Sequence, residues 1–120
     1  MIYNILCSTD DNYIPYCGIM LTSLFESNKE KTFNVYIQCE SINDSNRAIL
    51  KEMEKRYDNK IIIINITGKD LVNCPIRQGD HVSIAAYYRL FAPNVLPKEL
   101  DKILYLDCDI IVNGNIDDLY

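Results

Sequence analysis

Two aspartates one residue apart are the side chains in this sequence with the clearest chemical potential. Asp107 and Asp109 interrupt the apolar run 102–112, whose Ile, Leu and Tyr residues predict a buried β-strand. In an extended chain, alternate side chains leave the same face and advance about 6.6 Å over two residues. Both carboxylates can therefore point at one position, while Cys108 points the other way.

Two neighbouring carboxylates repel each other and resist losing water, so one of them should take up a proton unless a cation lies between them. Mg²⁺ or Mn²⁺ fits a site of carboxylates, water and phosphate oxygens, because these ions prefer hard oxygen ligands. The pattern alone leaves a second interpretation open. Both acids can simply turn to solvent at the end of the strand, where Asp is common in turns.

The composition limits the class of protein. A chain of 120 residues with 48% hydrophobic and 24% charged residues predicts one globular domain with a modest core. The net charge of -5 argues against general affinity for nucleic acid or anionic membranes, since such partners need a basic face. No apolar run approaches the roughly 20 residues of a membrane span, and residues 1–4 enter a predicted strand rather than a signal peptide. We therefore expect a cytoplasmic protein without a transmembrane segment.

The five cysteines are odd in number and lack C-x-x-C spacing. This usage favours reduced thiols over a disulfide set or a zinc site. We expect most of them to be small core residues.

The elements that position the two aspartates follow an alternating pattern. Strands are expected over 3–7, 33–39 and 61–64, with a helix from Ile14 to about residue 27 and a second helix after an N-cap at Asn43. This order predicts a doubly wound α/β fold, with a mostly parallel sheet and helices on both faces. The run 61–64 is apolar on both faces, which is typical of a central strand. The second helix is expected to turn these residues inward: Ile49, Leu50, Met53 and Tyr57.

The loop 8–13 is the natural partner of the two aspartates, because ligands of open α/β sheets bind at the carboxyl ends of the strands. If the first strand and the Asp107 strand are parallel neighbours, this loop lies beside both acids. Asp10 and Asn12 offer the acceptor and donor groups that suit a pyrimidine edge, and Tyr13 offers a ring that can stack on it. The alternative is a capped loop, in which Asp10 or Asn12 caps the first helix and Tyr13 packs against the protein.

A further helix is expected over 81–91, and it carries two candidates. The planar guanidinium of Arg89 suits a diphosphate, although a solvated or acid-paired surface Arg is the alternative. His81, the only histidine, can act as a ligand or an acid–base group. A lone His at the start of a helix can equally serve as a cap or a hydrogen-bond partner.

Three blocks of the sequence together resemble glycosyltransferase family 8, the family of bacterial lipopolysaccharide galactosyl- and glucosyltransferases and of glycogenin. The blocks are residues 10–13, 81–90 and 104–112, which fall in the family's order and spacing, and the resemblance runs over residues 1–120. It implies a GT-A fold with a Rossmann-like sheet, a UDP-sugar donor, a carbohydrate acceptor and retention of anomeric configuration. It also implies Mn²⁺ or Mg²⁺ as cofactor and a role in lipopolysaccharide biosynthesis.

The resemblance also assigns roles by position. The residues that it implies bind the donor nucleotide are Ser8, Asp10, Asn12, Tyr13, Val82, Arg89, Asp107 and Cys108. Of these, Asp10, Asn12 and Tyr13 are implied to bind uracil. Asp107 and Asp109 match the metal-binding pair. Arg89 and Asp107 are the implied catalytic residues, since Arg89 faces the donor phosphates and Asp107 also faces the donor ribose and sugar. Cys108 matches a middle position that touches the nucleoside through its backbone.

Family members continue well beyond the segment that Tyr120 matches, to a histidine that completes the metal site and to the acceptor pocket. We therefore expect residues 1–120 to be the N-terminal nucleotide-sugar-binding part of a truncated GT-A domain, which binds UDP and metal weakly and can self-associate through exposed edges. One alternative is a phosphohydrolase of the haloacid dehalogenase type, with Asp107 as nucleophile and Asp109 as acid–base group. That motif normally opens the first strand of its domain, whereas here three strands and three helices are expected before the aspartates. The other alternative is a non-catalytic nucleotide-binding module.

Overall fold

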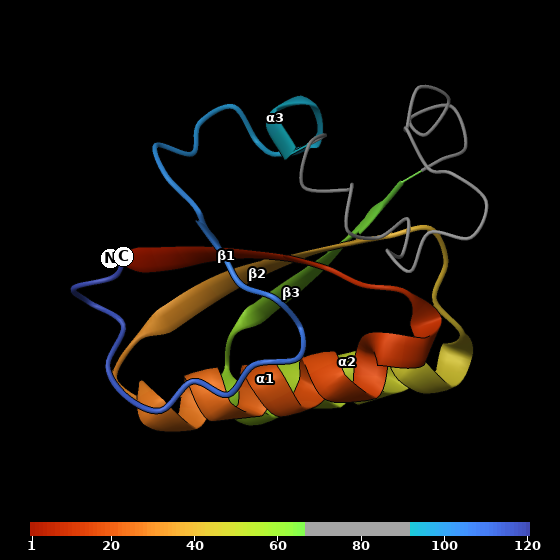
Figure 1. Ribbon diagram of the computed structural model, residues 1–120, viewed down its shortest axis with the longest axis horizontal. Coiled ribbons are helices and arrows are strands. Elements are labelled where there is room, and N and C mark those ends of the chain that lie inside the picture. The colour runs from red at the N-terminus through yellow and green to blue at the C-terminus, as the bar shows by residue number, and fades with distance from the viewer. Residues whose placement is uncertain (67–91) are drawn as a thin grey trace.

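The computed structural model describes residues 1–66 and 92–120. Their strands form one parallel sheet in the order β3-β2-β1-β4, and the strands are β1 (Ile2–Ser8), β2 (Thr32–Cys39), β3 (Lys60–Asn65) and β4 (Leu104–Tyr105) (Figure 1). The parallel α/β architecture expected from the sequence is confirmed. The helix expected over 81–91 lies outside the described residues, and with it His81, Val82 and Arg89.

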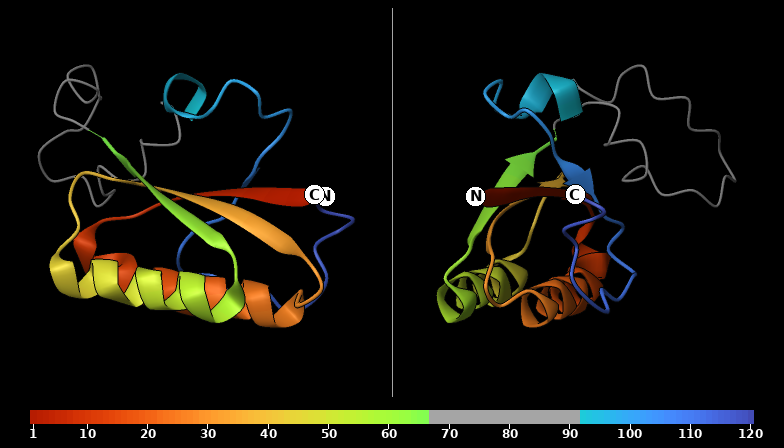
Figure 2. Two further views of the ribbon diagram at one scale, coloured as in Figure 1. Left: turned by 180° about the vertical axis from the view of Figure 1, so that it is seen from behind. Right: turned by 90° about the vertical axis from the view of Figure 1, so that its left-hand side faces the viewer.

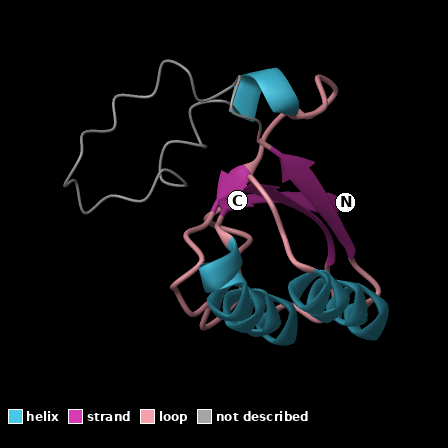
Figure 3. Ribbon diagram, turned by 90° about the vertical axis from the view of Figure 1, so that its right-hand side faces the viewer, coloured by secondary structure: helices cyan, strands magenta, loops and turns pink. Residues whose placement is uncertain are grey.

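Two long helices cover one face of this sheet. α1 (Ile14–Ser27) and α2 (Asp44–Tyr57) lie side by side beneath the strands, as Figures 1 and 2 show from several sides. The one-turn helix α3 (Ala92–Val95) lies on the opposite side of the sheet (Figure 3). Within the described parts of the chain, no helix has the length and hydrophobicity that crossing a membrane requires.

Local sequence signals explain where both long helices begin. α1 follows a single turn of 3-10 helix, η1 (Asp11–Tyr13), and has Pro15 in its first turn, where no backbone donor is missed. The Asn43 side chain accepts a hydrogen bond from the backbone N–H of Asn46 at 2.8 Å, so the predicted N-cap of α2 is confirmed.

The core lies between the sheet and the two helices. Alternate residues of β1 and β2 point into it, and α1 contributes a buried stripe at helical spacing. From α2, Leu50 and Met53 are buried as expected, whereas Ile49 is 43% exposed, so its predicted inward orientation is wrong. Ile49 instead lines an open groove between α1 and α2, together with Gly18 and Ile19 of α1.

The strand 61–64 was expected at the centre of the sheet, but β3 lies at the edge of the sheet that the described residues form. Its residues Ile62, Ile63 and Ile64 are half-buried rather than fully covered. The apolar pattern of a strand indicates what packs against its two faces, but not which strands lie beside it. The position of β3 in the sheet could therefore not be predicted from this pattern.

The strand around the aspartates is much shorter than the predicted run 102–112. β4 comprises two residues, the backbone N–H of Leu106 still donates to the carbonyl oxygen of Leu6 at 2.9 Å, and Cys108 and Asp109 lie in a turn. The two aspartates therefore follow the strand and are not part of it.

Polar side chains of α1 explain why the chain leaves the sheet here. The Ser27 hydroxyl donates to the carbonyl oxygen of Val112 at 3.0 Å, and the N–H of Val112 donates to the Ser23 hydroxyl at 2.9 Å. The N–H of Ile116 donates to the side-chain oxygen of Asn28 at 3.1 Å. This polar clamp, made by Ser23, Ser27 and Asn28, holds residues 112–116 alongside α1 (Figure 1). We call residues 107–109 the aspartate turn. β4 fixes the chain before this turn, and the polar clamp fixes the chain after it.

Candidate functional site

The two aspartates and the loop 8–13 meet at the carboxyl edge of the sheet. β1 and β4 are parallel neighbours in register, with Ile5 opposite Leu104 and Leu6 opposite Tyr105. Beyond the strands, the Cys108 thiol lies 3.3 Å from the carbonyl oxygen of Ser8 and donates to it. The predicted adjacency of the first loop and the aspartate motif is therefore confirmed.

The aspartate turn presents acids outward and a thiol inward. Asp107 and Asp109 are exposed, whereas Cys108 between them is 8% exposed and belongs to the core. The opposite orientation predicted for Cys108 is confirmed, although a turn rather than an extended strand produces it. Carboxylate oxygens are the hard ligands that Mn²⁺ and Mg²⁺ prefer. Because both carboxylates are exposed, they can bind a hydrated cation without first losing their own water.

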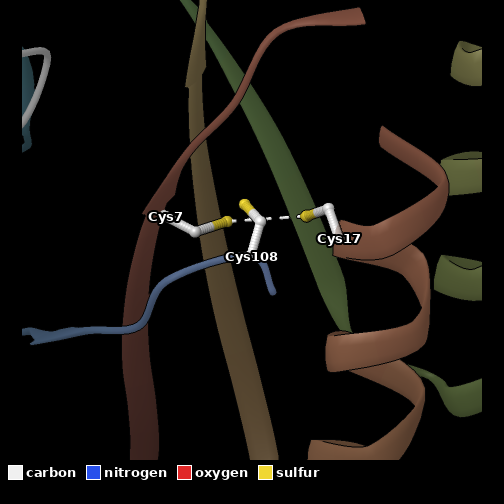
Figure 4. Close-up of side chains that lie close together, drawn as sticks. All are labelled: Cys7, Cys17 and Cys108. Carbon is white, nitrogen blue, oxygen red and sulfur yellow. Dashed lines mark hydrogen bonds between the residues drawn. The ribbon is translucent and has the colours of Figure 1, made fainter. Parts of the chain in front are cut away.

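Cys108 is anchored beside two other thiols, Cys7 of β1 and Cys17 of α1 (Figure 4). Hydrogen bonds donated by Cys17 and Cys7 lower the pKa of the Cys108 thiol. The Ser8 carbonyl opposes this shift, since it accepts a hydrogen bond only from the protonated thiol. Hydrogen bonds to Cys108 together with burial raise the pKa of Cys7 and of Cys17.

The loop 8–13 is held from below by β2. The Ser8 hydroxyl donates to the side-chain oxygen of Gln38 at 2.9 Å, and the backbone N–H of Thr9 donates to the Gln38 carbonyl oxygen at 2.9 Å. Gln38 is fully buried, so these bonds are shielded from water. Ser8, a predicted nucleoside-pocket residue, is thereby fixed in place at the end of β1.

Asp10 has the capping role that the alternative interpretation predicted, at the 3-10 turn rather than at α1 itself. Its carboxylate accepts a hydrogen bond from the backbone N–H of Tyr13 at 3.1 Å. A carboxylate has about four acceptor positions, so this cap leaves Asp10 able to accept from a ligand as well.

Tyr13 and Asn12 are available at the surface. Tyr13 is 47% exposed and its ring lies 5.4 Å from that of Tyr16, in a tilted arrangement. The ring therefore packs against a neighbouring side chain and also reaches solvent, so both interpretations of Tyr13 stay open. Asn12 is also exposed, so both side chains can meet a base at the edge of the sheet.

Two positioning residues of this site were missed by the sequence analysis. One is Gln38. The other is Asp11, whose carboxylate accepts from the Asn43 N–H at 3.0 Å and from the Asn46 side chain at 3.1 Å, which ties the loop to the start of α2. A polar amide near the end of a mostly apolar strand was a visible signal for Gln38, but the partners of Asp11 are 32 and 35 residues away.

Comparison with known proteins decides the family. The family model of glycosyl transferase family 8 matches residues 4–120, nearly the whole chain. The chain belongs to glycosyl transferase family 8. This membership gives no support to the haloacid dehalogenase-type alternative.

Curated relatives agree with the family 8 match. A putative glycosyltransferase of Haemophilus influenzae is 30% identical over 117 residues, which cover 98% of this chain and 34% of the relative. A lipopolysaccharide 1,2-glucosyltransferase of Escherichia coli K12 is 30% identical over 116 residues, 97% of this chain and 34% of the relative. The chain thus spans about a third of the length of these family 8 relatives.

A solved structure supports the same fold. The galactosyltransferase LgtC, determined in complex with donor and acceptor sugar analogues, superposes with a TM-score of 0.83 at 26% identity, over 97% of this chain and 41% of LgtC. The parallel α/β sheet described above is therefore that of a GT-A glycosyltransferase, as the resemblance implied.

Proposed function

We propose that the protein carrying this chain transfers a hexose from a UDP-sugar to a carbohydrate acceptor with retention of configuration, and that residues 1–120 form the nucleotide-sugar-binding part of its GT-A domain. The observation that carries the proposal is the junction of the loop 8–13 with the aspartate turn through Cys108 and Ser8, in a chain of glycosyl transferase family 8. This junction puts candidate base-binding and diphosphate-binding groups at one edge of the sheet.

Uracil would bind over the loop 8–13. The exposed ring of Tyr13 can stack on the base, while Asp10 and Asn12 can accept from and donate to its polar edge. Ser8, held by Gln38, would line the nucleoside pocket. Val82 is assigned to the same pocket by resemblance.

The diphosphate would lie over the aspartate turn. Asp107 and Asp109 would hold Mn²⁺ or Mg²⁺, whose charge would stabilise the leaving diphosphate. Asp107 would also orient the ribose and the hexose, and the backbone of Cys108 would contact the nucleoside. Arg89, a catalytic residue by resemblance, would add positive charge beside the phosphates.

The relatives named as lipopolysaccharide glucosyl- and galactosyltransferases suggest a glucosyl or galactosyl donor and an acceptor of the lipopolysaccharide class. A role for His81, a cytoplasmic location and self-association through exposed strand edges stay predictions from the sequence.

A donor-turnover assay tests the proposed function. We expect the protein that carries this chain to release UDP from UDP-glucose or UDP-galactose when Mn²⁺ is present, to leave GDP-sugars intact, and to stop when the metal is chelated. Release of phosphate from phosphomonoesters without turnover of any UDP-sugar would contradict the proposal. Binding of UDP-sugars without any turnover would contradict it too, in favour of a non-catalytic module.

Substitution of Tyr13 tests the base-binding role. We expect Tyr13→Ala to weaken uridine and UDP binding alike by about 1–3 kcal/mol, or about 5- to 150-fold, because a stacked base is lost. Tyr13→Phe keeps the ring and should bind both ligands as the wild type does. Titration calorimetry measures both variants, and unchanged affinity in Tyr13→Ala would show that the ring does not contact the base.

A further inference from the structure

Three thiols from three separate elements converge beneath the aspartate turn. The Sγ atoms of Cys7 in β1, Cys17 in α1 and Cys108 after β4 all lie within 4.8 Å of one another, and those of Cys7 and Cys17 are 3.7 Å apart (Figure 4). None of the three forms a disulfide. The proposed sugar transfer assigns no chemical step to these sulfur atoms, and Cys108 serves there only to join the aspartate turn to the loop 8–13 through the Ser8 carbonyl oxygen.

We propose that this thiol cluster binds one Cu(I) ion through three thiolate ligands. A metal–thiolate bond is about 2.3 Å long. Three sulfurs around one ion at that distance are about 4.0 Å apart in a trigonal plane and about 3.8 Å apart in a tetrahedral arrangement. The observed triangle reaches either spacing with small side-chain movements, so the ligands are already gathered.

The surroundings of the cluster favour a soft cation. Cys7 and Cys17 are fully buried and Cys108 is 8% exposed, and among the His, Cys, Asp and Glu side chains of the described residues the group consists of these three thiols. Soft thiolates select ions such as Cu(I) and Zn²⁺, whereas Mg²⁺ and Mn²⁺ prefer oxygen. Structural zinc almost always has four protein ligands, and within residues 1–66 and 92–120 this group supplies three. A three-coordinate Cu(I) ion matches that number.

The cluster would be distinct from the site proposed for the donor. Asp107 and Asp109 are exposed, while the Cys108 side chain between them points into the core. A hard oxygen site and a soft sulfur site would then lie on opposite sides of one turn. On binding, three S–H bonds are replaced by three copper–sulfur bonds, three protons leave to solvent, and copper stays in the +1 state. The hydrogen bond that the Cys108 thiol donates to the Ser8 carbonyl oxygen is lost in this step.

Competition with a Cu(I)-chelating dye tests the proposal. We expect the fully reduced, metal-free protein to withdraw one equivalent of Cu(I) from bicinchoninate, and X-ray absorption of that complex to show three sulfur neighbours at about 2.3 Å. Cys7→Ala and Cys17→Ala should each weaken Cu(I) binding at least about 100-fold, because removal of groups that merely support a ligand already costs 10- to 100-fold. Cys39→Ala is the matched control. It removes a buried thiol at the end of β2 that is not in the cluster, and should leave Cu(I) affinity unchanged.

The alternative is that the three thiols are only small core side chains. Failure of the wild-type protein to compete with the dye, or a loss in Cys39→Ala as large as in Cys7→Ala, would overturn the proposal. Oxygen or nitrogen neighbours in the absorption spectrum would overturn it as well, and that spectrum needs no variant to fold. Asp109→Asn should keep full Cu(I) affinity. A loss of Cu(I) affinity in this variant would contradict a sulfur site separate from the aspartates.

Discussion

Asp109→Asn is expected to weaken Mn²⁺ binding at least about 100-fold, because a carboxylate that binds the metal directly should matter more than supporting groups whose loss costs 10- to 100-fold. The amide keeps the shape of the side chain and removes its charge. Asp109 is exposed, so the change removes no core contact and the melting temperature should stay the same. Mn²⁺ affinity can be followed by electron paramagnetic resonance of the free ion, independently of any turnover.

The control for this experiment is Asp118→Asn, which neutralises another exposed aspartate outside the aspartate turn. It should bind Mn²⁺ as the wild type does, so a general effect of net charge would appear in both variants. Full Mn²⁺ affinity in Asp109→Asn would mean that the metal binds elsewhere, and the assignment of Asp107 and Asp109 would fail with it.

Asn28→Ala is expected to lower the free energy of unfolding by about 3 kcal/mol, the largest effect we predict on stability. Asn28 is fully buried, and its side-chain N–H₂ donates to the carbonyl oxygens of Leu24 at 3.0 Å and Gly114 at 3.1 Å. Its oxygen accepts from the N–H of Ile116, which would remain buried without a partner. Leaving one buried polar group unsatisfied costs about 1–3 kcal/mol, and this change affects several.

Urea denaturation measures the loss, and two further variants separate its causes. Ser27→Ala removes one bond of the same polar clamp, to Val112, and should cost only about 1 kcal/mol. Asn28→Asp keeps the acceptor for Ile116 but turns the donors to Gly114 and Leu24 into an acceptor, so it should be at least as destabilising as Asn28→Ala. A stability of Asn28→Ala within about 0.5 kcal/mol of the wild type would show that the clamp does not hold residues 112–116.

Much of the fold followed from local signals in the sequence. The period of the apolar residues after Ile14 predicted α1, and Asn43 predicted the start of α2, because both signals act within a few residues of where they are read. The strand around the aspartates was predicted too long for the opposite reason. Its end depends on the bond from Ser27 to Val112, 85 residues apart, which no local pattern reveals.

The candidate site, too, could be predicted from the sequence only in part. Asp107, Asp109 and the loop 8–13 were identified from spacing and from the rule that ligands collect at the carboxyl edge, and the pairing of β1 with β4 confirmed their adjacency. The cysteine cluster could not be predicted. Its members come from three elements that only the tertiary packing brings together, and the sequence shows no metal-binding spacing among them.

Titration of UDP into the protein with and without Mn²⁺ tests the central claim most directly. If Asp107 and Asp109 reach the diphosphate through a bound cation, Mn²⁺ should strengthen UDP binding at least about tenfold, or about 1.4 kcal/mol, and should do so in Asp118→Asn but not in Asp109→Asn. Uridine, which has no phosphate, should bind equally in both conditions. Equal UDP affinity with and without Mn²⁺ would contradict the account.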